Sequence, residues 1–294
     1  MPARTVRFKQ VDVFTAVPFK GNPLAVVFDA DGLDDAQMQA IASWTNLSET
    51  TFLVKATEPT ADYRVRIFTT HGELPFAGHP TLGTAHALRE SGYQPKTPGK
   101  LIQQCGAGLV ELRAQDDGVW AFAAPPARVT PLPTDLYATL TQALQSDAVD
   151  FSAAPCGIDN GAPWLVVRVN SAADCLAIKA DAAILARVVE AVGAHGVAVY
   201  GPHDAGGPAT FEVRCLMVGG NLGVGEDPVT GSANAALAGL LSTQDRRPGL
   251  TYTVRQGTVI GRAGQVSVRY DDAAGKTWIG GSAVTVVDGT FRLP

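Results

Sequence analysis

Short runs rich in β-branched and aromatic residues recur through the first half of the chain and predict strands. They extend from Val6 to Phe14, Leu24 to Phe28, Thr51 to Lys55, Tyr63 to Thr69, Leu109 to Ala114 and Val119 to Ala123. Two helices are predicted between them. Asp34 is a good N-cap for a helix that ends near Trp44, and Pro80, favoured in a first helical turn, opens one that ends near Glu90.

The chain repeats itself when it is shifted by 148 residues. Tyr63-Arg64-Val65-Arg66 then lies over Phe211-Glu212-Val213-Arg214, and Pro80 lies over Pro228. The second half contains its own predicted helices, near Asp181 to Val192 and near Thr230 to Ser242. Because the shift is about half the length of 294 residues, the pattern indicates one domain that was duplicated and fused.

We therefore predict an α+β fold of two pseudo-symmetric lobes. Each lobe is expected to be a strongly bent antiparallel sheet or barrel wrapped around one helix of small residues. The predicted lobes are residues 1–124 and 134–281, with the proline-rich segment 125–133 as a linker. The sequence leaves open whether the C-terminal strand 282–294 completes the first lobe. We expect the active site in the cleft between the lobes, where pockets often form.

Composition and charge exclude several classes of protein. The net charge is -5 and the basic residues are scattered, which argues against nucleic acid as a partner. The four cysteines form no CxxC pair, and the N-terminus shows no apolar signal region, so a cytoplasmic location is expected. The uncharged run from Pro228 to Gln244 is too short for a membrane span and predicts a buried helix instead.

Two glycine-containing segments, residues 76–84 and 225–232, each lead into a predicted helix. Exposed backbone N–H groups and the positive end of a helix dipole suit a carboxylate or another anion. The shift of 148 places His79 over Asp227, so the two side chains would face each other if a pseudo-two-fold axis relates the lobes. The alternative is that these residues only cap their helices.

Glu49 lies between a predicted helix and a predicted strand, and the shift of 148 places Val197 at its counterpart. An unduplicated carboxylate suits a site with one proton-transfer group, because an apolar cleft can raise its pKa toward working pH. The alternative is a solvated surface glutamate. Nucleophile-elbow, phosphate-loop and dinucleotide motifs are absent from the sequence, and the histidines have no metal-ligand spacing, so no cofactor or metal is predicted.

Taken together, the motifs resemble the PhzF-like phenazine-biosynthesis family within the diaminopimelate-epimerase-like fold. The segments that carry the resemblance are 11–15, 21–27, 46–52, 66–69, 73–81 and 225–233. They occur in order through both halves, so the resemblance covers essentially the whole chain. It implies a cofactor-independent isomerase that moves a proton on a small acidic substrate, such as a cyclic dihydro-hydroxyanthranilate. A homodimer is also implied.

The resemblance further assigns residue roles. Glu49 matches the acid/base glutamate of the family, and His79 and Asp227 match its active-site histidine and aspartate. The substrate-binding residues correspond to Gly78, Gly231 and Ser232. Two alternatives remain open, an amino-acid epimerase or racemase and a metabolite-binding protein without activity. Epimerases of this fold use paired cysteines, whereas the two glycine-containing segments here hold none.

Overall fold

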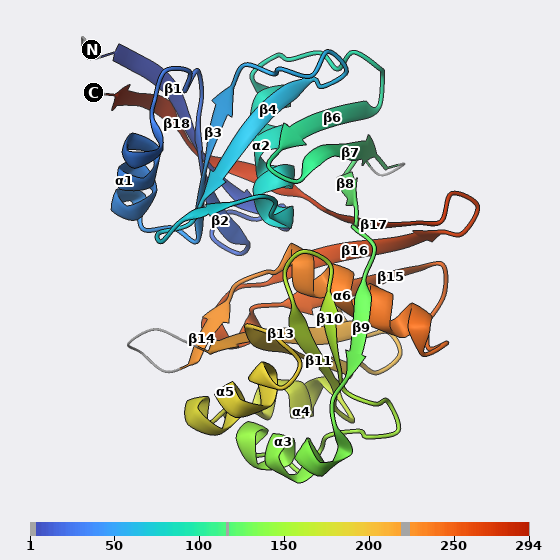
Figure 1. Ribbon diagram of the computed structural model, residues 1–294. Helices are drawn as coiled ribbons and strands as arrows, with labels where there is room; N and C mark the ends of the chain where they lie inside the picture. The colour runs from blue at the N-terminus through green and yellow to red at the C-terminus, as the bar shows by residue number, and fades with distance from the viewer. Residues whose placement is uncertain (1–3, 116–117, 219–223, 294) are drawn as a thin grey trace. The chain divides into compact units, whose positions relative to one another are not determined.

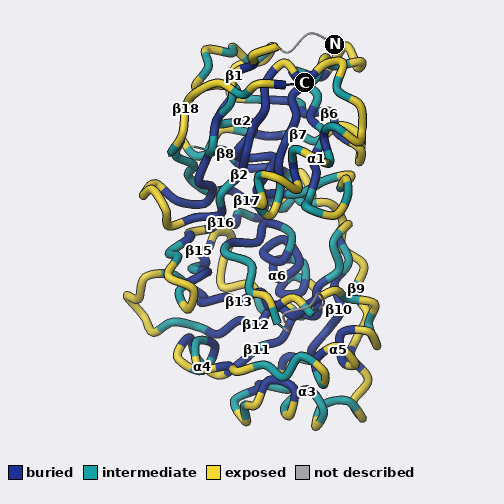
Figure 2. The backbone as a smooth tube through the Cα atoms, turned by 90° about the vertical axis from the view of Figure 1, so that its left-hand side faces the viewer, coloured by how far each residue is buried: buried dark blue, intermediate teal, exposed yellow. Residues whose placement is uncertain are grey.

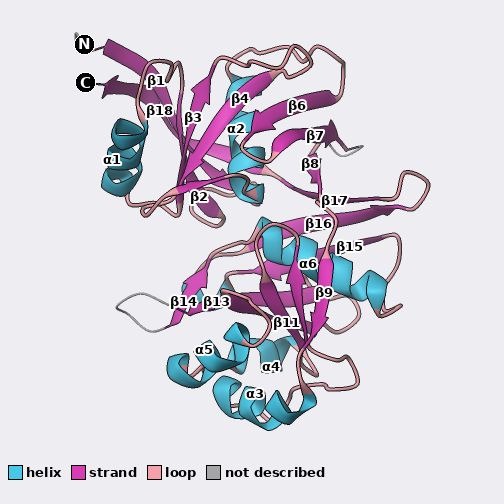
Figure 3. Cartoon of the chain, in the orientation of Figure 1, coloured by secondary structure: helices cyan, strands magenta, loops and turns pink. Residues whose placement is uncertain are grey.

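The computed structural model describes residues 4–115, 118–218 and 224–293, and the chain divides into two compact units (Figure 1). The first unit comprises Met1–Ala123 and Gly280–Pro294, and the second comprises Ala124–Ile279. Each unit combines one multi-stranded sheet with one helix that lies among the strands (Figure 3). Among the described residues, every helix is too short or too polar to span a membrane.

The first unit contains nine strands and two helices within its described residues. The strands are β1 (Arg4–Val13), β2 (Asn22–Val27), β3 (Glu49–Val54), β4 (Tyr63–Phe68), β5 (Glu73–Leu74), β6 (Lys100–Cys105), β7 (Gly108–Ala114), β8 (Trp120–Ala123) and β18 (Ala283–Leu293), and the helices are α1 (Asp35–Thr45) and α2 (Gly78–Glu90). The pairing runs β18–β1–β2–β3–β4, after which β4 pairs with both β5 and β6, β6 with β7, and β7 with β8.

Most strand pairs of the first unit are antiparallel, as expected, but two are parallel, so the sheet is mixed. β2 is parallel to β3, and β4 is parallel to β6. A parallel pair needs a crossover connection, and the two helices provide it: α1 lies between β2 and β3 in the sequence, and α2 lies between β4 and β6.

Helix α2 is the central element of the first unit. Nine of its thirteen residues are buried, and it contacts β1, β2, β3, β8 and β18. Small residues allow this close packing: a Cβ on Gly83 would lie 2.6 Å from the Leu24 side chain and 2.7 Å from that of Val13. A helix surrounded by strands must be small or apolar on every side, as the sequence predicted for its counterpart in the second half.

The second unit repeats this arrangement. Its strands are β9 (Arg128–Pro131), β10 (Cys156–Asp159), β11 (Trp164–Arg168), β12 (Gly196–Pro202), β13 (Phe211–Val218), β14 (Val224–Asp227), β15 (Thr251–Gln256), β16 (Gly264–Asp271) and β17 (Lys276–Gly281). Its α-helices are α3 (Tyr137–Leu144), α4 (Ala172–Ala177), α5 (Ala182–Glu190) and α6 (Gly231–Thr243), with short 3-10 turns at Thr134–Leu136 and Thr258–Ile260. Figure 2 shows α6 as a buried helix among the strands, in keeping with the prediction for residues 228–244.

The order of pairing is the same in both units, which confirms the duplication. In the second unit β10–β11 is antiparallel, β11–β12 parallel, β12–β13 antiparallel, and β13 pairs with β14 antiparallel and with β15 parallel. The first unit has the same directions at β1–β2, β2–β3, β3–β4, β4–β5 and β4–β6. The second unit has four α-helices and the first has two within the described residues, and α3 and α5 pack together over a cluster of buried aliphatic residues that includes Leu140, Leu185 and Val197.

The segment expected to be a linker is partly sheet. Residues 128–131 form β9, which pairs with β10 along its whole length. The proline-rich composition did not prevent this, because an edge strand tolerates Pro at its end. At the other end of the chain, β18 pairs with β1 from Arg4↔Leu293 to Val13↔Ala283, so the C-terminal strand extends the sheet of the first unit.

Candidate active site

Glu49 is the first residue of β3 and follows closely on the end of α1. Asp34 caps α1 and forms a capping box with Gln37, as the sequence predicted for the helix start. At the other end Asn46 adopts the left-handed conformation, with φ 54°, which ends the helix and turns the chain toward β3. Glu49 then pairs with Leu24 in the parallel β2–β3 ladder, which fixes its backbone.

The carboxylate of Glu49 lies beside the imidazole of His79. Glu49 Oε2 is 3.3 Å from His79 Nε2, and the two side chains are 15% and 6% exposed. His79 is the second residue of α2, the buried helix that the strands surround. The structure therefore brings together two residues that lie 30 positions apart in the sequence and that the resemblance assigned to one site.

Burial sets the charge of His79. Removal from water lowers the pKa of His79 to about 3, so the imidazole is neutral near pH 7. The contact with Glu49 is consequently a contact between a carboxyl group and a neutral ring, although its distance is that of an ion pair. Asn22 Nδ2 lies 3.4 Å from His79 Nδ1, and the amide donates there when the ring proton is on Nε2. That tautomer puts the ring proton on Nε2, the nitrogen that lies 3.3 Å from Glu49 Oε2, although the two atoms do not have hydrogen-bond geometry.

A buried polar network fixes the elements that carry these two residues. Thr50, next to Glu49, has its hydroxyl 2.7 Å from that of Thr45 on α1. Thr84 of α2 donates to Thr51 of β3 at 3.0 Å, and Gln103 donates to Thr81 of α2 at 2.9 Å. Satisfied buried polar groups specify one geometry, so the helix and the strand are held in a defined register.

In the second unit, Asp227 ends β14 and precedes a connection of three residues to α6. Its carboxylate accepts a short hydrogen bond from the Thr230 hydroxyl. Gln256, fully buried, donates to the Asp227 carbonyl at 3.1 Å and to the Thr230 hydroxyl at 2.9 Å. Its own carbonyl accepts from the Thr230 N–H at 3.1 Å and from Asn234 at 3.0 Å. One glutamine thus uses both ends of its amide to hold the loop.

The three residues predicted to bind substrate all lie in the first turns of the two central helices. Gly78 and Gly231 are the first residues of α2 and α6, and both are buried. Ser232 follows Gly231, and its hydroxyl accepts a hydrogen bond from Trp164 Nε1 at 3.0 Å. Among the described residues, neither helix receives a capping hydrogen bond from the side chain of its N-cap residue. The N-cap residues are Ala77 and Thr230, so neither His79 nor Asp227 occupies the N-cap position itself.

The repeat alignment needs a correction at this point. The shift of 148 holds for β4 and β13, which begin at Tyr63 and Phe211. The helices begin at Gly78 and Gly231, a shift of 153, because the second connection is five residues longer. His79 is therefore equivalent to Ser232.

The sheet registers give the other two equivalences. Asp227 is equivalent to Leu74, since Leu74 pairs with Ile67 and Asp227 with Cys215. The counterpart of Glu49 is Gly196 and not Val197, because Thr50 pairs with Phe68 and Val197 with Leu216. The conclusion that the acid is not duplicated is unaffected.

The four cysteines are buried and free. Burial raises the pKa of Cys215, which lies opposite Asp227 in the β13–β14 ladder, well above its ordinary value. It also raises the pKa of Cys105, Cys156 and Cys175. A base must be deprotonated to accept a proton, so these thiols are poorly suited to the paired-cysteine chemistry of the epimerase alternative.

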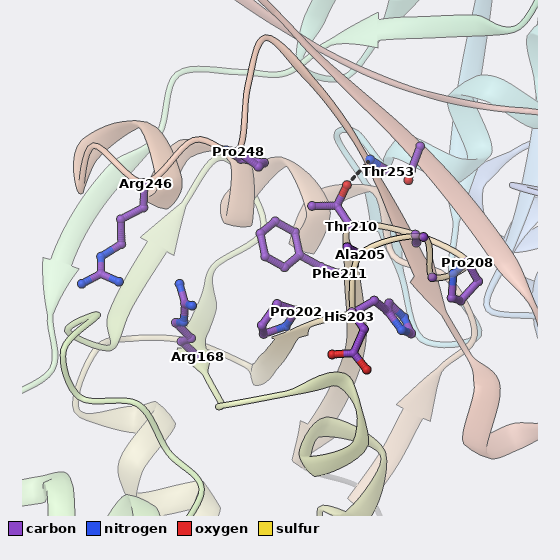
Figure 4. Close-up of a pocket in the computed structure, with 14 residues that line it drawn as sticks. Arg168, Pro202, His203, Ala205, Pro208, Thr210, Phe211, Arg246, Pro248 and Thr253 are labelled. Carbon is purple, nitrogen blue, oxygen red and sulfur yellow. Dashed lines mark hydrogen bonds between the residues drawn. The ribbon is translucent and has the colours of Figure 1, made fainter.

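A hollow of about 600 Å³ in the second unit is separate from all of these residues (Figure 4). Its cationic groups have neighbours of opposite charge or acceptor oxygens. Arg168 Nε is 3.0 Å from Asp150, Arg246 donates to the Ser152 carbonyl at 2.7 Å, and His203 Nε2 is 3.0 Å from Glu212. Because its charged groups are already paired, this hollow is a weaker candidate for the active site than the surroundings of Glu49.

Comparison with known proteins identifies the relatives of the chain. Residues 11–289 match the family model described as phenazine biosynthesis-like protein. The chain is 39% identical to antisense-enhancing sequence 1 of Schizosaccharomyces pombe, over 96% of this chain and 97% of that protein. It is 34% identical to trans-2,3-dihydro-3-hydroxyanthranilate isomerase of Pseudomonas chlororaphis, over 96% and 98%. A crystal structure of the Bacillus anthracis phenazine biosynthesis protein of the PhzF family superimposes with a TM-score of 0.83 at 25% identity and covers 99% of both chains.

The duplicated α+β fold and these matches define the class of the protein, an isomerase that acts on a small molecule. More specifically, the chain belongs to the phenazine-biosynthesis-like (PhzC-PhzF) family. The family resemblance inferred from the motifs is confirmed.

Proposed function

We propose that the chain is a cofactor-independent isomerase in which Glu49 moves a proton on a small, carboxylate-bearing cyclic substrate. The relative from Pseudomonas chlororaphis is named for trans-2,3-dihydro-3-hydroxyanthranilate, and we propose a substrate of this chemical class here. The observation that carries the proposal is the contact between Glu49 and a buried, neutral His79 at 3.3 Å. It places one carboxylate in contact with a neutral ring at a defined position.

The proposed reaction needs no group beyond the side chain itself. The Glu49 carboxylate accepts a proton from a carbon of the substrate, and the electron pair of that C–H bond moves into the neighbouring double-bond system. The carboxyl group then delivers the proton to a different carbon, so the composition of the substrate is unchanged. His79, in contact with Glu49, is proposed to hold the carboxyl group in place during the transfer.

The other predicted residues are assigned to substrate binding. Ser232 already accepts a hydrogen bond from Trp164, so its own O–H is available to donate to a substrate oxygen. Asp227 is held by Thr230 and Gln256 and is suited to accept from a substrate amino or hydroxyl group. The N–H groups that open α2 and α6, at Gly78 and Gly231, suit the substrate carboxylate.

Replacement of Glu49 by Gln tests the role of the carboxylate. With trans-2,3-dihydro-3-hydroxyanthranilate as the probe, we expect Glu49→Gln to lower kcat by roughly 10²–10⁴-fold, the usual contribution of positioned proton transfer. Glu58→Gln is the matched control, because Glu58 is exposed and remote in the fold from the β3–α2 contact. Equal rates for the wild type and Glu49→Gln would rule out the mechanism, whereas no turnover by the wild type would rule out this substrate.

Deuterated water provides a second readout. The carboxyl proton of Glu49 exchanges with solvent, so the wild type should place deuterium on the carbon that it protonates. Product formed by Glu49→Gln should carry deuterium at that carbon at a rate lower by the same factor. Deuterium incorporation that survives the substitution would instead favour the epimerase or racemase alternative.

The proposal also includes a cytoplasmic homodimer, the state and location that the family resemblance and the cysteine usage support. Light scattering of the purified chain tests the assembly: a mass near twice the monomer mass of 30.6 kDa is expected. A monomer at micromolar concentration would contradict it.

A further inference from the structure

An arginine–glutamate pair occurs in both units at equivalent positions. In the first unit Arg66 of β4 donates to Glu73 of β5 through Nε at 2.8 Å and through Nη2 at 2.5 Å. Its third nitrogen, Nη1, donates to Asp35 at the start of α1 at 2.7 Å.

In the second unit Arg214 of β13 likewise donates two hydrogen bonds, through Nε and Nη2, to the carboxylate of Glu226 of β14. We call this two-pronged contact the fork. Arg214 Nη2 lies 2.8 Å from Glu226 Oε2, and Nε lies 3.2 Å from Oε1. Nη1 donates to the Ile178 carbonyl at 2.7 Å, at the end of α4. Arg214 therefore joins three elements, β13, β14 and the end of α4.

The two pairs share register as well as chemistry. Glu73 pairs with Phe68 in its ladder and Glu226 with Leu216, and in each case the arginine precedes that ladder partner by two residues. Residues two apart on a strand share a face, so both arginines reach the glutamate diagonally. The central helix begins five residues after the glutamate in both units, at Gly78 and at Gly231.

The two arginine–glutamate pairs differ in how far they are buried. Arg66 and Glu73 are 19% and 39% exposed, whereas Arg214 and Glu226 are 7% and 9% exposed. Interactions between charges strengthen as water is excluded, and a buried charge that loses its partner is strongly unfavourable. The second pair is thus the rigid copy, and the residue that follows Glu226 is Asp227.

We propose that Arg214 and Glu226 are positioning residues that fix β14 and thereby the direction of the Asp227 side chain toward the substrate. The inference rests on the proposed function, in which Asp227 binds the substrate. β14 is a short strand of four residues whose described ladder is with β13 alone. The fork between Arg214 and Glu226 therefore adds a side-chain link between β14 and β13 to the backbone hydrogen bonds of the ladder. Arg66 and Glu73 are the more exposed copy of the same device, at a position where the equivalent of Asp227 is Leu74.

Hydrogen exchange tests the positioning without any substrate. Glu226→Gln keeps the size of the side chain and removes its charge, and Arg214→Lys keeps the charge and removes the fork. Both should accelerate amide exchange in the peptide that covers residues 224–231 by about tenfold or more, since β14 then opens more often. The matched control, Glu73→Gln, should leave that peptide unchanged. Unchanged exchange in both Glu226→Gln and Arg214→Lys would overturn the inference.

Kinetics of a double-mutant cycle test the route through Asp227. With trans-2,3-dihydro-3-hydroxyanthranilate, we expect Glu226→Gln to lower kcat/KM by roughly 10²-fold, the scale of a displacement of about 1 Å at a site. In an Asp227→Asn background the same substitution should cause no further loss, because the pair acts through Asp227. Losses that multiply would overturn the inference. If Asp227→Asn alone leaves turnover unchanged, the role of Asp227 in the proposed function fails, and the exchange experiment still decides whether the pair fixes β14.

Discussion

A neutral imidazole buried beside a carboxyl group makes stability depend on pH in a defined direction. Burial lowers the pKa of His79 from 6.5 to about 3, so between these values the unfolded chain binds a proton that the folded chain does not. Folding stability should therefore fall as the pH falls from about 6.5 toward 3. One such proton corresponds to about 2 kcal/mol between pH 6.5 and pH 5.

Urea unfolding at pH 7 and pH 5 measures this contribution. The loss of unfolding free energy between the two pH values should be smaller in His79→Gln than in the wild type, by up to about 2 kcal/mol. His71→Gln, at an exposed position, should behave as the wild type. An identical pH dependence in His79→Gln and the wild type would mean that the pKa of the ring is the same in the folded and the unfolded chain.

Gln256 offers a second prediction for a single residue. Gln256→Ala leaves the Thr230 N–H and the Asn234 amide without their buried acceptor. Each unsatisfied buried group costs about 1–3 kcal/mol, so we expect a loss of about 3 kcal/mol in unfolding free energy. Gln265→Ala, at an exposed position on the neighbouring strand, should change it by less than about 0.5 kcal/mol. A loss as small as that of the control would show that the network adapts to the missing amide.

The sequence identified the ionisable residues of the candidate site more readily than the residues that hold them in place. Glu49 and His79 were found through motif resemblance, and the structure brings them into contact. Asn22 lay within a recognised motif without an assigned role, and Gln256 gave no signal at all. A buried amide is recognisable only from its partners, and those of Gln256 lie 22 to 29 residues away in the chain.

Among whole elements, the packing of α2 against the sheet leads to a prediction at Gly83. A Cβ there would approach the side chains of Leu24 and Val13 to 2.6 and 2.7 Å. Gly83→Ala should therefore destabilise the chain by about 1–3 kcal/mol, although Ala normally favours a helix by about 1 kcal/mol over Gly. Gly289→Ala, where a Cβ meets nothing within 4 Å, is the control. Stabilisation by Gly83→Ala would show that α2 can move away from β1 and β2.

Helices whose start is marked by a capping residue in the sequence were predicted well. Helix α1 begins after its predicted N-cap, Asp34, and helix α5 begins after Asp181, where a helix start was predicted. β5 has two residues and β6 carries polar Lys and Gln residues, so neither gave a recognisable strand pattern. Parallel pairing was missed because alternation shows that a strand is half-buried but not which neighbour it pairs with. An ungapped shift could not detect that the second connection is five residues longer.

At the scale of the whole molecule, the first unit is assembled from both ends of the chain. β18 is the strand that lies beside β1 along its full length. Deletion of residues 283–294 should therefore expose the edge of β1 and abolish the cooperative unfolding of the first unit, while the contiguous second unit keeps its own transition. Val287→Thr, a change of an outward-facing residue of β18, is the control and should retain both transitions. A truncated chain with both transitions intact would show that β18 is dispensable.

The pairing of the first strand with the last also sets the order in which a ribosome can deliver the finished fold. Residues 124–279 emerge as one uninterrupted stretch and can collapse while synthesis continues. The half that emerges earlier must wait with an open sheet edge until the final dozen residues leave the exit tunnel. The half made first is thus completed last, and until then one edge of β1 has no partner strand.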